Sequence, residues 1–273
     1  MTVHRRNPPV LKRFGQHFLT DRSVLMDIAQ AVDADPADTV IEIGPGRGAL
    51  TDLLVERAGR VVGIEIDRAL AERLRERYAD RANVEIIEAD FLETRIADVV
   101  VGPYLVAGNV PYYITTPILF HVLQPRFPRL AVFLVQREVA LRMVAIAGSK
   151  EYGALSVNIQ AVASAEIVRR VPPSAFRPPP SVESAVIRIT PLASPRVPME
   201  RLPAFRAFVQ AAFGMRRKQM VNVIRSVGEM SPMDAERLLR EVGVDPRVRP
   251  ETLSVEKFAA LASRISGLPA VAD

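Results

Sequence analysis

The sequence contains no cysteine, which excludes a disulfide scaffold, a thiolate metal site and a cysteine nucleophile, and leaves the redox compartment open. It also lacks an apolar run approaching the roughly 18 residues of a membrane-spanning helix, so we expect no membrane segment. Lysine is scarce, because only four of the 36 basic residues are lysine and the rest are arginine.

Motifs for metal chemistry and nucleophilic catalysis are missing as well. There is no His-x-x-x-His pair, no aspartate cluster and no phosphate-loop lysine, so we expect neither a metal site nor a nucleoside triphosphate site. The three histidines, His4, His17 and His121, have no nucleophile elbow nearby. A Ser/His/Asp mechanism is therefore unsupported.

The chain does have a moderate excess of positive charge on an ordinary folded composition. Its 273 residues carry a formal net charge of +5, with 49% hydrophobic residues, which excludes a disordered or collagen-like chain. The basic excess favours an acidic partner. The preference for arginine has two explanations that stay open, nucleic-acid contact and codon bias in a GC-rich genome.

The first 14 residues form a basic segment without an acid. Pro8 and Pro9 prevent a helix there, and a transit peptide would be amphipathic and serine-rich. We therefore expect an extended basic arm on a cytoplasmic protein.

Apolar strands alternate with amphipathic helices over about the first 150 residues. This pattern is typical of right-handed crossovers and a mostly parallel sheet covered on both faces. Two later β-like stretches, 154–168 and 182–190, have no helix between them and predict an antiparallel edge hairpin. We expect strands at 39–43, 60–65, 84–88, 104–108 and 130–135, and helices at 21–32, 49–57, 68–78, 116–123 and 138–147.

A proline-rich linker then separates a segment whose periodicity is helical only. The sequence thus predicts two domains, an α/β domain over 1–192 that includes the basic arm and a small all-α domain over 200–273. In the second domain we expect helices at 205–213, 216–227, 233–242 and 255–265.

A glycine-rich turn follows the first strand of the α/β pattern. Gly44, Gly46 and Gly48 allow a ligand to approach the main chain at a strand-to-helix turn. Glu65 ends the next strand, 21 residues after Gly44, where a carboxylate accepts hydrogen bonds from two ribose hydroxyls. The pattern fits a dinucleotide and S-adenosylmethionine (AdoMet) equally well.

Polar groups also follow the next two strands. Asp90 can accept from an exocyclic amine such as adenine N6, or can simply cap the next helix. The sequence Asn109-Val110-Pro111-Tyr112 offers the Asn oxygen and a carbonyl at Val110 or Pro111 as acceptors for an aryl amine, and a ring for stacking. Two such acceptors favour a pyramidal nitrogen with a localised lone pair, which a hydride-transfer enzyme does not need. The motif therefore predicts methyl transfer to an amine.

Five segments in order carry a family resemblance that spans about residues 12–261. They are Gly15-Gln16-His17-Phe18-Leu19, residues 42–51, residues 109–114, residues 176–184 and residues 213–222. With these segments the chain resembles the bacterial small-subunit rRNA adenine N6,N6-dimethyltransferases, the KsgA/RsmA family. The resemblance implies a Rossmann-like class I methyltransferase sheet, AdoMet as cofactor, and dimethylation of two adjacent adenosines near the 3′ end of 16S rRNA.

The resemblance also implies roles for individual residues. His17 stands where relatives often have Asn, and Phe176 matches an aromatic thought to stack on the target adenine opposite Tyr112. The other interpretation of Phe176, which stays open, is a loop anchor that packs under the neighbouring prolines. We expect a catalytic set of Asn109, Pro111, Tyr112 and Phe176. The implied AdoMet contacts are His17, Leu19, Gly44, Gly46, Glu65, Asp90 and Asn109, and the implied rRNA contacts are Arg216, Arg217, Lys218 and Arg225.

The expected enzyme works as a monomer on 16S rRNA within the small ribosomal subunit, with no membrane and no metal. Three alternatives stay open at this point. They are a large-subunit rRNA adenine methyltransferase of the antibiotic-resistance type, a non-catalytic ribosome-assembly factor, and a nicotinamide oxidoreductase.

Overall fold

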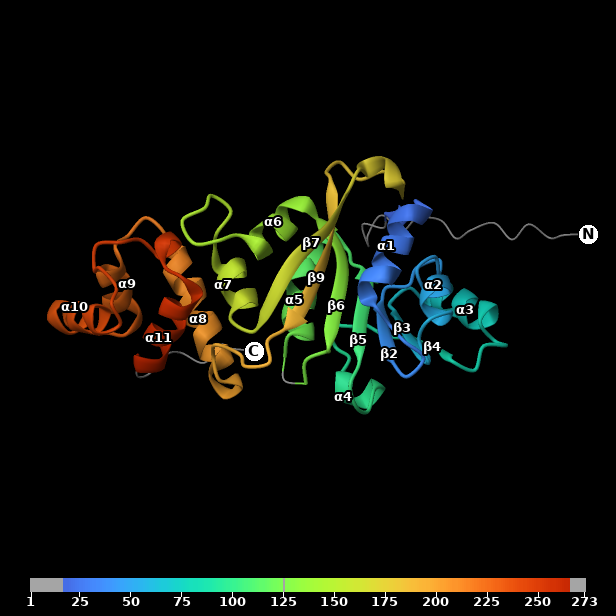
Figure 1. The fold of residues 1–273 in the computed structure, drawn as a ribbon, viewed down its shortest axis with the longest axis horizontal. Helices are drawn as coiled ribbons and strands as arrows, with labels where there is room; N and C mark the ends of the chain where they lie inside the picture. The colour runs from blue at the N-terminus through green and yellow to red at the C-terminus, as the bar shows by residue number, and fades with distance from the viewer. Residues whose placement is uncertain (1–16, 125, 266–273) are drawn as a thin grey trace, which may run out of the picture. The chain divides into compact units, whose positions relative to one another are not determined.

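The computed structural model of the chain describes residues 17–124 and 126–265. The predicted basic arm lies outside the described residues. The fold is an α/β sheet followed by C-terminal helices (Figure 1). The strands are β1 (Phe18–Leu19), β2 (Thr39–Ile43), β3 (Arg60–Glu65), β4 (Val84–Glu88), β5 (Leu105–Asn109), β6 (Leu130–Gln136), β7 (Ala163–Val171), β8 (Phe176–Arg177) and β9 (Ser184–Pro191).

Eleven α-helices connect or follow these strands within the described part of the chain. They are α1 (Arg22–Val32), α2 (Thr51–Val55), α3 (Arg68–Arg77), α4 (Ile96–Val99), α5 (Thr115–Val122), α6 (Arg137–Val144), α7 (Ala154–Gln160), α8 (Leu202–Gly214), α9 (Met220–Val227), α10 (Pro232–Glu241) and α11 (Val255–Arg264). No helix among the described residues is both long and apolar enough to cross a bilayer.

Among the described residues, the main sheet has seven strands in the order β4-β3-β2-β5-β6-β9-β7. The pairs β3–β4, β2–β3, β2–β5 and β5–β6 are parallel, and β6–β9 is antiparallel. The mostly parallel sheet with an antiparallel edge is thus confirmed. Because the chain leaves β2 toward β3 and returns to its other side with β5, a crevice is expected at the carboxyl ends of these two strands.

An N-cap residue and an apolar face explain why α1 forms. Asp21 accepts hydrogen bonds from the main-chain N–H groups of Ser23 and Val24, which caps α1 as predicted. One face of α1 carries Val24 and Ile28, both fully buried. The same core cluster includes Leu19 and Phe176 of the separate two-stranded ribbon β1–β8.

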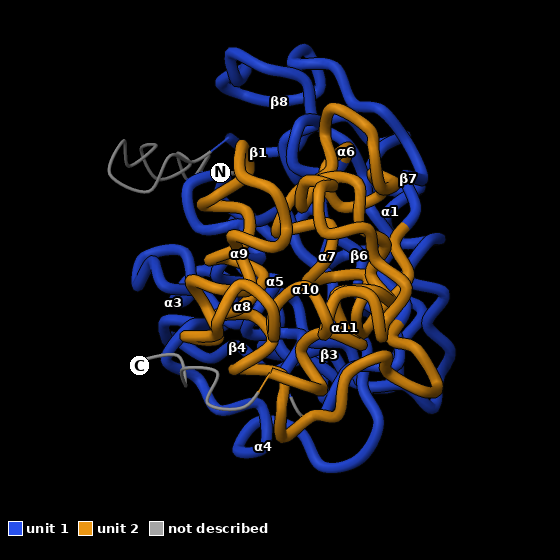
Figure 2. Tube along the Cα trace, turned by 90° about the vertical axis from the view of Figure 1, so that its left-hand side faces the viewer, with its two compact units in different colours: residues 1–140, 166–190 blue, residues 141–165, 191–273 orange. Residues whose placement is uncertain are grey.

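The chain forms two compact units, coloured separately in Figure 2. The first contains residues 1–140 and 166–190, and the second contains residues 141–165 and 191–273. The predicted domains place 141–165 with the sheet, whereas the compact units group this segment with the C-terminal helices. The reason is packing, because α7 contacts α8 and α11 of the same unit.

Aromatic side chains build the core of the second unit. Phe258 packs against Phe208 at 5.9 Å and Phe213 at 5.6 Å between ring centroids. Tyr152 meets Phe213 edge-on at 6.0 Å and donates its hydroxyl hydrogen to the Leu253 carbonyl at 2.8 Å. The Tyr152 bond joins positions 101 residues apart in sequence.

Two predictions of local structure were wrong. Residues 154–160 form the helix α7 rather than the start of a strand, because five consecutive residues of α7 are buried and its short apolar sequence has no helical periodicity. Arg216, Arg217 and Lys218 do not open a helix but lie in the turn before α9. Positive charge opposes the dipole of a helix N-terminus, which is consistent with a start at Met220.

Candidate functional site

The candidate site residues of the sheet collect at one edge, where the parallel strands end. Gly44 directly follows β2, Glu65 ends β3, Asp90 follows β4, and Asn109 ends β5. Strands β2 and β5 are neighbours, with Ile43 paired to Gly108. The structure therefore brings these four residues to the edge at which ligands bind open α/β sheets.

The glycine turn leaves room beside its first glycine. Gly44 has φ +63° and Gly46 has φ +59°, values that favour glycine. A Cβ atom built on Gly44 would meet no atom within 4 Å, whereas one on Gly46 would lie 3.3 Å from the Phe18 ring. A ligand can thus approach the main chain at Gly44, while Phe18 covers Gly46.

Glu65 ties the glycine turn to β3. Its Oε2 accepts from the Gly46 N–H at 2.8 Å, and its Oε1 accepts from the Asp67 N–H at 2.9 Å. The side chain is buried, which raises its pKa, and these main-chain bonds oppose part of the rise. Each carboxylate oxygen keeps a second lone pair. The carboxylate is therefore held in place with acceptor capacity left for a ligand.

Glu42 is a buried acid that the predicted site residues do not include. It is 2% exposed, and burial raises its pKa to about 8, with the neighbouring Thr51 hydroxyl opposing part of that rise. Its Oε2 has no hydrogen-bond partner among the described residues. A sequence signal existed, because Glu42 is the only charged residue in the apolar strand Thr39–Ile43.

Asp90 caps a turn in this structure. Its Oδ1 accepts from the Leu92 N–H at 2.8 Å, and its main-chain oxygen accepts from the Thr94 hydroxyl at 2.7 Å. Asp90 therefore caps a turn and not the next helix, because α4 begins only at Ile96, with Arg95 as its N-cap residue. No residue in the described ranges bonds to Oδ2, so contact with a ligand amine is compatible with the cap.

The amide of Asn109 is oriented by a main-chain carbonyl. Its Nδ2 donates to the His17 oxygen at 3.0 Å, and because a carbonyl only accepts, Oδ1 is the atom left to accept from a ligand. His17 is itself fixed by a contact of 2.9 Å between Nδ1 and the Pro178 oxygen. The His17 ring lies roughly parallel to the Tyr112 ring, with 6.1 Å between centroids.

The hydrogen bonds of the turn after Asn109 distinguish the two candidate carbonyl acceptors, Val110 and Pro111. The Pro111 oxygen accepts from the Ile114 N–H and from the Thr115 hydroxyl, each at 3.2 Å. Val110 is therefore the better candidate for a carbonyl that faces a ligand.

The Tyr112 hydroxyl lies 2.6 Å from Ser184 Oγ, and burial raises the pKa of this phenol. A cavity of about 60 Å³ is lined by His17, Phe18, Gly46, Asn109, Val110, Pro111 and Tyr112.

Two predicted site residues have buried side chains. Phe176 is fully buried in the cluster around α1 and pairs with Leu19 across the β1–β8 ribbon. A fully buried ring offers no face to a base, so this placement does not fit the predicted stacking role. Leu19 is 6% exposed, which leaves mainly its main chain for contact with a cofactor.

Comparison with known proteins adds to this geometry. The family described as ribosomal RNA adenine dimethylase matches residues 10–266. The chain belongs to this family. Ribosomal RNA small subunit methyltransferase A of Alkaliphilus metalliredigens is 42% identical over 93% of this chain and 91% of that protein. The same-named protein of Moorella thermoacetica is 44% identical over 92% of this chain and 90% of that protein.

Solved structures agree with the fold. A dimethyladenosine transferase from Plasmodium falciparum superposes with a TM-score of 0.75 at 24% identity, over 90% of this chain and 96% of that one. The 23S rRNA methyltransferase ErmE superposes with a TM-score of 0.71 at 28% identity, over 91% and 99%. The class I methyltransferase sheet predicted for this dimethylase-family chain is confirmed.

The basic residues expected to contact rRNA lie in the second unit of this dimethylase-family protein. Arg217 and Lys218 are exposed in the turn between α8 and α9, and Arg225 is exposed on α9. Arg216 donates from Nε to Glu251 Oε2 at 3.0 Å. Ion pairing of Arg216 leaves Arg217, Lys218 and Arg225 as the more available cations of this group.

Proposed function

We propose that this protein uses AdoMet to dimethylate N6 of two adjacent adenosines near the 3′ end of 16S rRNA. The observation that carries the proposal is the pair of acceptors at the end of β5, Asn109 Oδ1 and the Val110 carbonyl, beside an open glycine turn. The relatives named ribosomal RNA small subunit methyltransferase A support the small subunit as the substrate.

The residues present fit AdoMet. The open space beside Gly44 accommodates a ligand against the main chain, and Glu65 keeps lone pairs for ribose hydroxyls. Asp90 Oδ2 suits the adenine amine of the cofactor. The His17 carbonyl accepts from Asn109, and Leu19 and Asn109 both line one cavity. When bound, AdoMet supplies an electrophilic methyl group.

Asn109 and Val110 act on the amine that receives the methyl. An aryl amine is a weak nucleophile because its lone pair is delocalised into the ring. Hydrogen bonds from its two N–H groups to Asn109 Oδ1 and the Val110 carbonyl favour a pyramidal nitrogen, with the lone pair directed away from both acceptors. This preorganised polarity and the positioning of the amine are the chain's main contributions to catalysis.

Tyr112 positions the base. Its hydroxyl is held by Ser184, so the ring has a fixed orientation beside Asn109 and can stack on an adenine. The adenosine must leave its own stack to reach this cavity. No side chain is assigned as a general base, because the proton can leave the nitrogen after transfer.

The other parts of the proposal concern the partner and the setting. Arg216, Arg217, Lys218 and Arg225 contact rRNA phosphates, and the second unit serves as the RNA-binding domain. Exposure of Arg217, Lys218 and Arg225 supports the contact with rRNA. The protein works as a cytoplasmic monomer.

Two alternatives remain as outcomes of the test. ErmE, at 28% identity, represents the large-subunit branch, but the small-subunit relatives are 42% and 44% identical. A non-catalytic assembly factor would not need the paired acceptors at Asn109 and Val110. Membership of the dimethylase family leaves the nicotinamide oxidoreductase without support.

The deciding experiment is incubation with labelled AdoMet and, separately, undermethylated small and large ribosomal subunits. Digestion of the RNA and identification of labelled nucleosides should give N6,N6-dimethyladenosine from small subunits only. Label in large subunits would assign the chain to the resistance branch. No label from either, with AdoMet still bound, would favour the assembly factor.

A further inference from the structure

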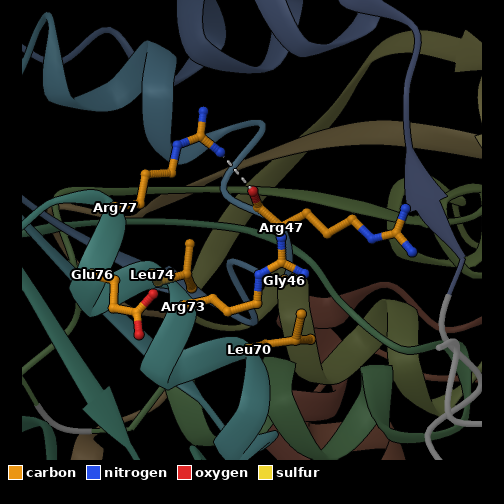
Figure 3. Close-up of a pocket in the computed structure, with 7 residues that line it drawn as sticks. All are labelled: Gly46, Arg47, Leu70, Arg73, Leu74, Glu76 and Arg77. Atoms are coloured by element: carbon orange, nitrogen blue, oxygen red, sulfur yellow. Dashed lines mark hydrogen bonds between the residues drawn. The ribbon is translucent and has the colours of Figure 1, made fainter. Parts of the chain in front are cut away.

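Three arginines lie beside the glycine turn and have no part in the function proposed above. Arg47 belongs to the turn itself, and Arg73 and Arg77 stand four residues apart on one face of α3. We call Arg47, Arg73 and Arg77 the arginine track. Together with Gly46, Leu70, Leu74 and Glu76 they line a cavity of about 320 Å³ (Figure 3).

Arg77 fixes the turn to α3. Its Nη1 donates to the Arg47 carbonyl at 2.9 Å, the bond drawn in Figure 3, and its Nη2 forms an ion pair with Asp52. Arg73 lies one helical turn earlier, and its side chain extends toward the glycine turn in the same view. Arg77 therefore has a structural role, and Arg73 is the cation of α3 best placed to meet a ligand in the cavity.

Positive charge exceeds negative charge around this cavity. Its lining contains three arginines and one acid, Glu76. Burial lowers the pKa of Arg47, and the positive charge of Arg73 lowers it further. Like charges held this close are stabilised by an anion placed between them. Guanidinium groups match phosphate oxygens in a bidentate geometry, so an oxygen-rich anion is the ligand class that fits.

The cavity beside the arginine track adjoins the smaller cavity of about 60 Å³ that contains Asn109 and Tyr112. Gly46 lines both the 320 Å³ cavity and the smaller cavity that contains Asn109 and Tyr112. The guanidinium carbon of Arg47 lies 4.1 Å from the centroid of the Phe18 ring, and Phe18 lines the smaller cavity too. Gly46, Phe18 and Arg47 thus connect the linings of the two cavities.

We propose that the arginine track binds a phosphodiester group of the rRNA strand beside the adenosine that is methylated. The identity of the nucleic acid rests on the proposed function. Arg73 makes the main phosphate contact, Arg47 extends it toward the base, and Arg77 holds the main chain of Arg47 in position. The track thus places the strand in register with the Asn109 acceptor pair.

One other anion has the same chemistry, the carboxylate of the methionine part of AdoMet. The two sources differ in what a loss of Arg73 would weaken. A phosphodiester contact contributes to RNA affinity and to its salt dependence, since each neutralised phosphate releases counterions. A carboxylate contact contributes to AdoMet affinity in the absence of RNA.

The test compares Arg73→Ala with Arg68→Ala. Arg68 lies on the same helix, is exposed, pairs with Glu72 and does not line the cavity, so it is a matched control. Binding of undermethylated small subunits is measured over a range of salt concentrations, and AdoMet binding is measured by calorimetry. For Arg73→Ala we expect weaker subunit binding, a salt slope lower by about one, and unchanged AdoMet affinity. Arg68→Ala should change none of these.

A loss of AdoMet affinity with unchanged subunit binding would overturn the proposal in favour of the carboxylate. No effect on either ligand would also overturn it. Arg73→Lys keeps the charge and should restore the salt slope, which separates a phosphate contact from a folding defect. Dimethyladenosine formation by the unaltered protein is scored in the same samples. Its absence would reject the proposed function, while the binding data would still report on the track.

Discussion

The side-chain amide of Asn109 donates to the main-chain oxygen of His17 at 3.0 Å, across 92 positions of sequence. This bond joins the end of β5 to the segment that enters β1, and it leaves Asn109 Oδ1 as the acceptor atom. A short N-terminal segment thus orients the amide that the proposed chemistry depends on. The orientation needs no other side chain, because a carbonyl accepts only from the amide nitrogen.

Replacement of Asn109 by alanine should slow methyl transfer with little change in AdoMet affinity. It removes a hydrogen bond that strengthens as the amine becomes pyramidal, and loss of one such preorganised group typically costs about 10²–10³ in rate. Single-turnover kinetics and calorimetry check the two quantities. Asn222→Ala, on the exposed side of α9, is the control. A parallel loss of AdoMet binding would contradict the role assigned to Asn109.

The raised pKa of Glu42 predicts that the free energy of unfolding depends on pH. Its folded-state pKa of about 8 lies above the ordinary value of 4.5, so the folded protein holds a proton that the unfolded chain releases between these values. The free energy of unfolding should therefore fall as pH rises through this window.

Glu42→Gln removes the ionisable group and should become more stable relative to the unaltered protein as pH rises. The difference should reach a few kcal/mol, roughly, above pH 8, because one pKa unit corresponds to about 1.4 kcal/mol. Urea titrations at pH 5, 7 and 9 measure it. A constant difference between the two proteins at all three values would show that Glu42 stays ionised in the fold.

Two mutations distinguish the role of the Tyr112 ring from the role of its hydroxyl group. Tyr112→Phe removes the 2.6 Å contact with Ser184 and should cost about 1 kcal/mol of stability while methyl transfer persists. Tyr112→Ala removes the stacking face and should raise the KM for the RNA substrate, since base stacking contributes about 1–3 kcal/mol. Steady-state kinetics and thermal melting distinguish the effects. Equal activity of the two variants would argue against stacking.

Phe176 should behave as a core residue. It is fully buried, so Phe176→Ala should lower the free energy of unfolding by about 3–5 kcal/mol. Phe176→Leu keeps most of the apolar volume and should retain methyl transfer at low temperature. A folded Phe176→Leu protein with intact AdoMet binding and a large loss of RNA affinity would instead restore the stacking role implied by the family.

Much of the sheet follows from local sequence. The strands 39–43, 60–65 and 84–88 are observed as predicted, because apolar β-branched runs flanked by turn residues and amphipathic helices leave few alternatives. The sequence also placed the glycine turn and the polar residues at the ends of successive strands. The structure brings them to one edge, since the carboxyl ends of parallel strands share that edge.

Other features depended on contacts distant in sequence. The helix α7 is buried on most sides, so its sequence lacks the periodicity that marks a helix at a surface. The burial of Phe176 depends on its pairing with Leu19, 157 positions earlier in the chain. The arginine track forms only because α3 packs beside the glycine turn, which brings Arg73 and Arg77 to Arg47.

The sequence by itself determined the order of elements, the glycine turn and the Asn109-to-Tyr112 motif, because these are set by periodicity and by residues adjacent in the chain. Tertiary structure alone decided which atom of Asn109 is presented, which carbonyl of the turn stays available, and where positive charge gathers. The Asn109 amide and the arginine track depend on contacts between segments far apart in sequence, whose partners no local pattern specifies. The choice of carbonyl depends on the folded geometry of the turn itself, in which the Pro111 oxygen bonds to Ile114 and Thr115.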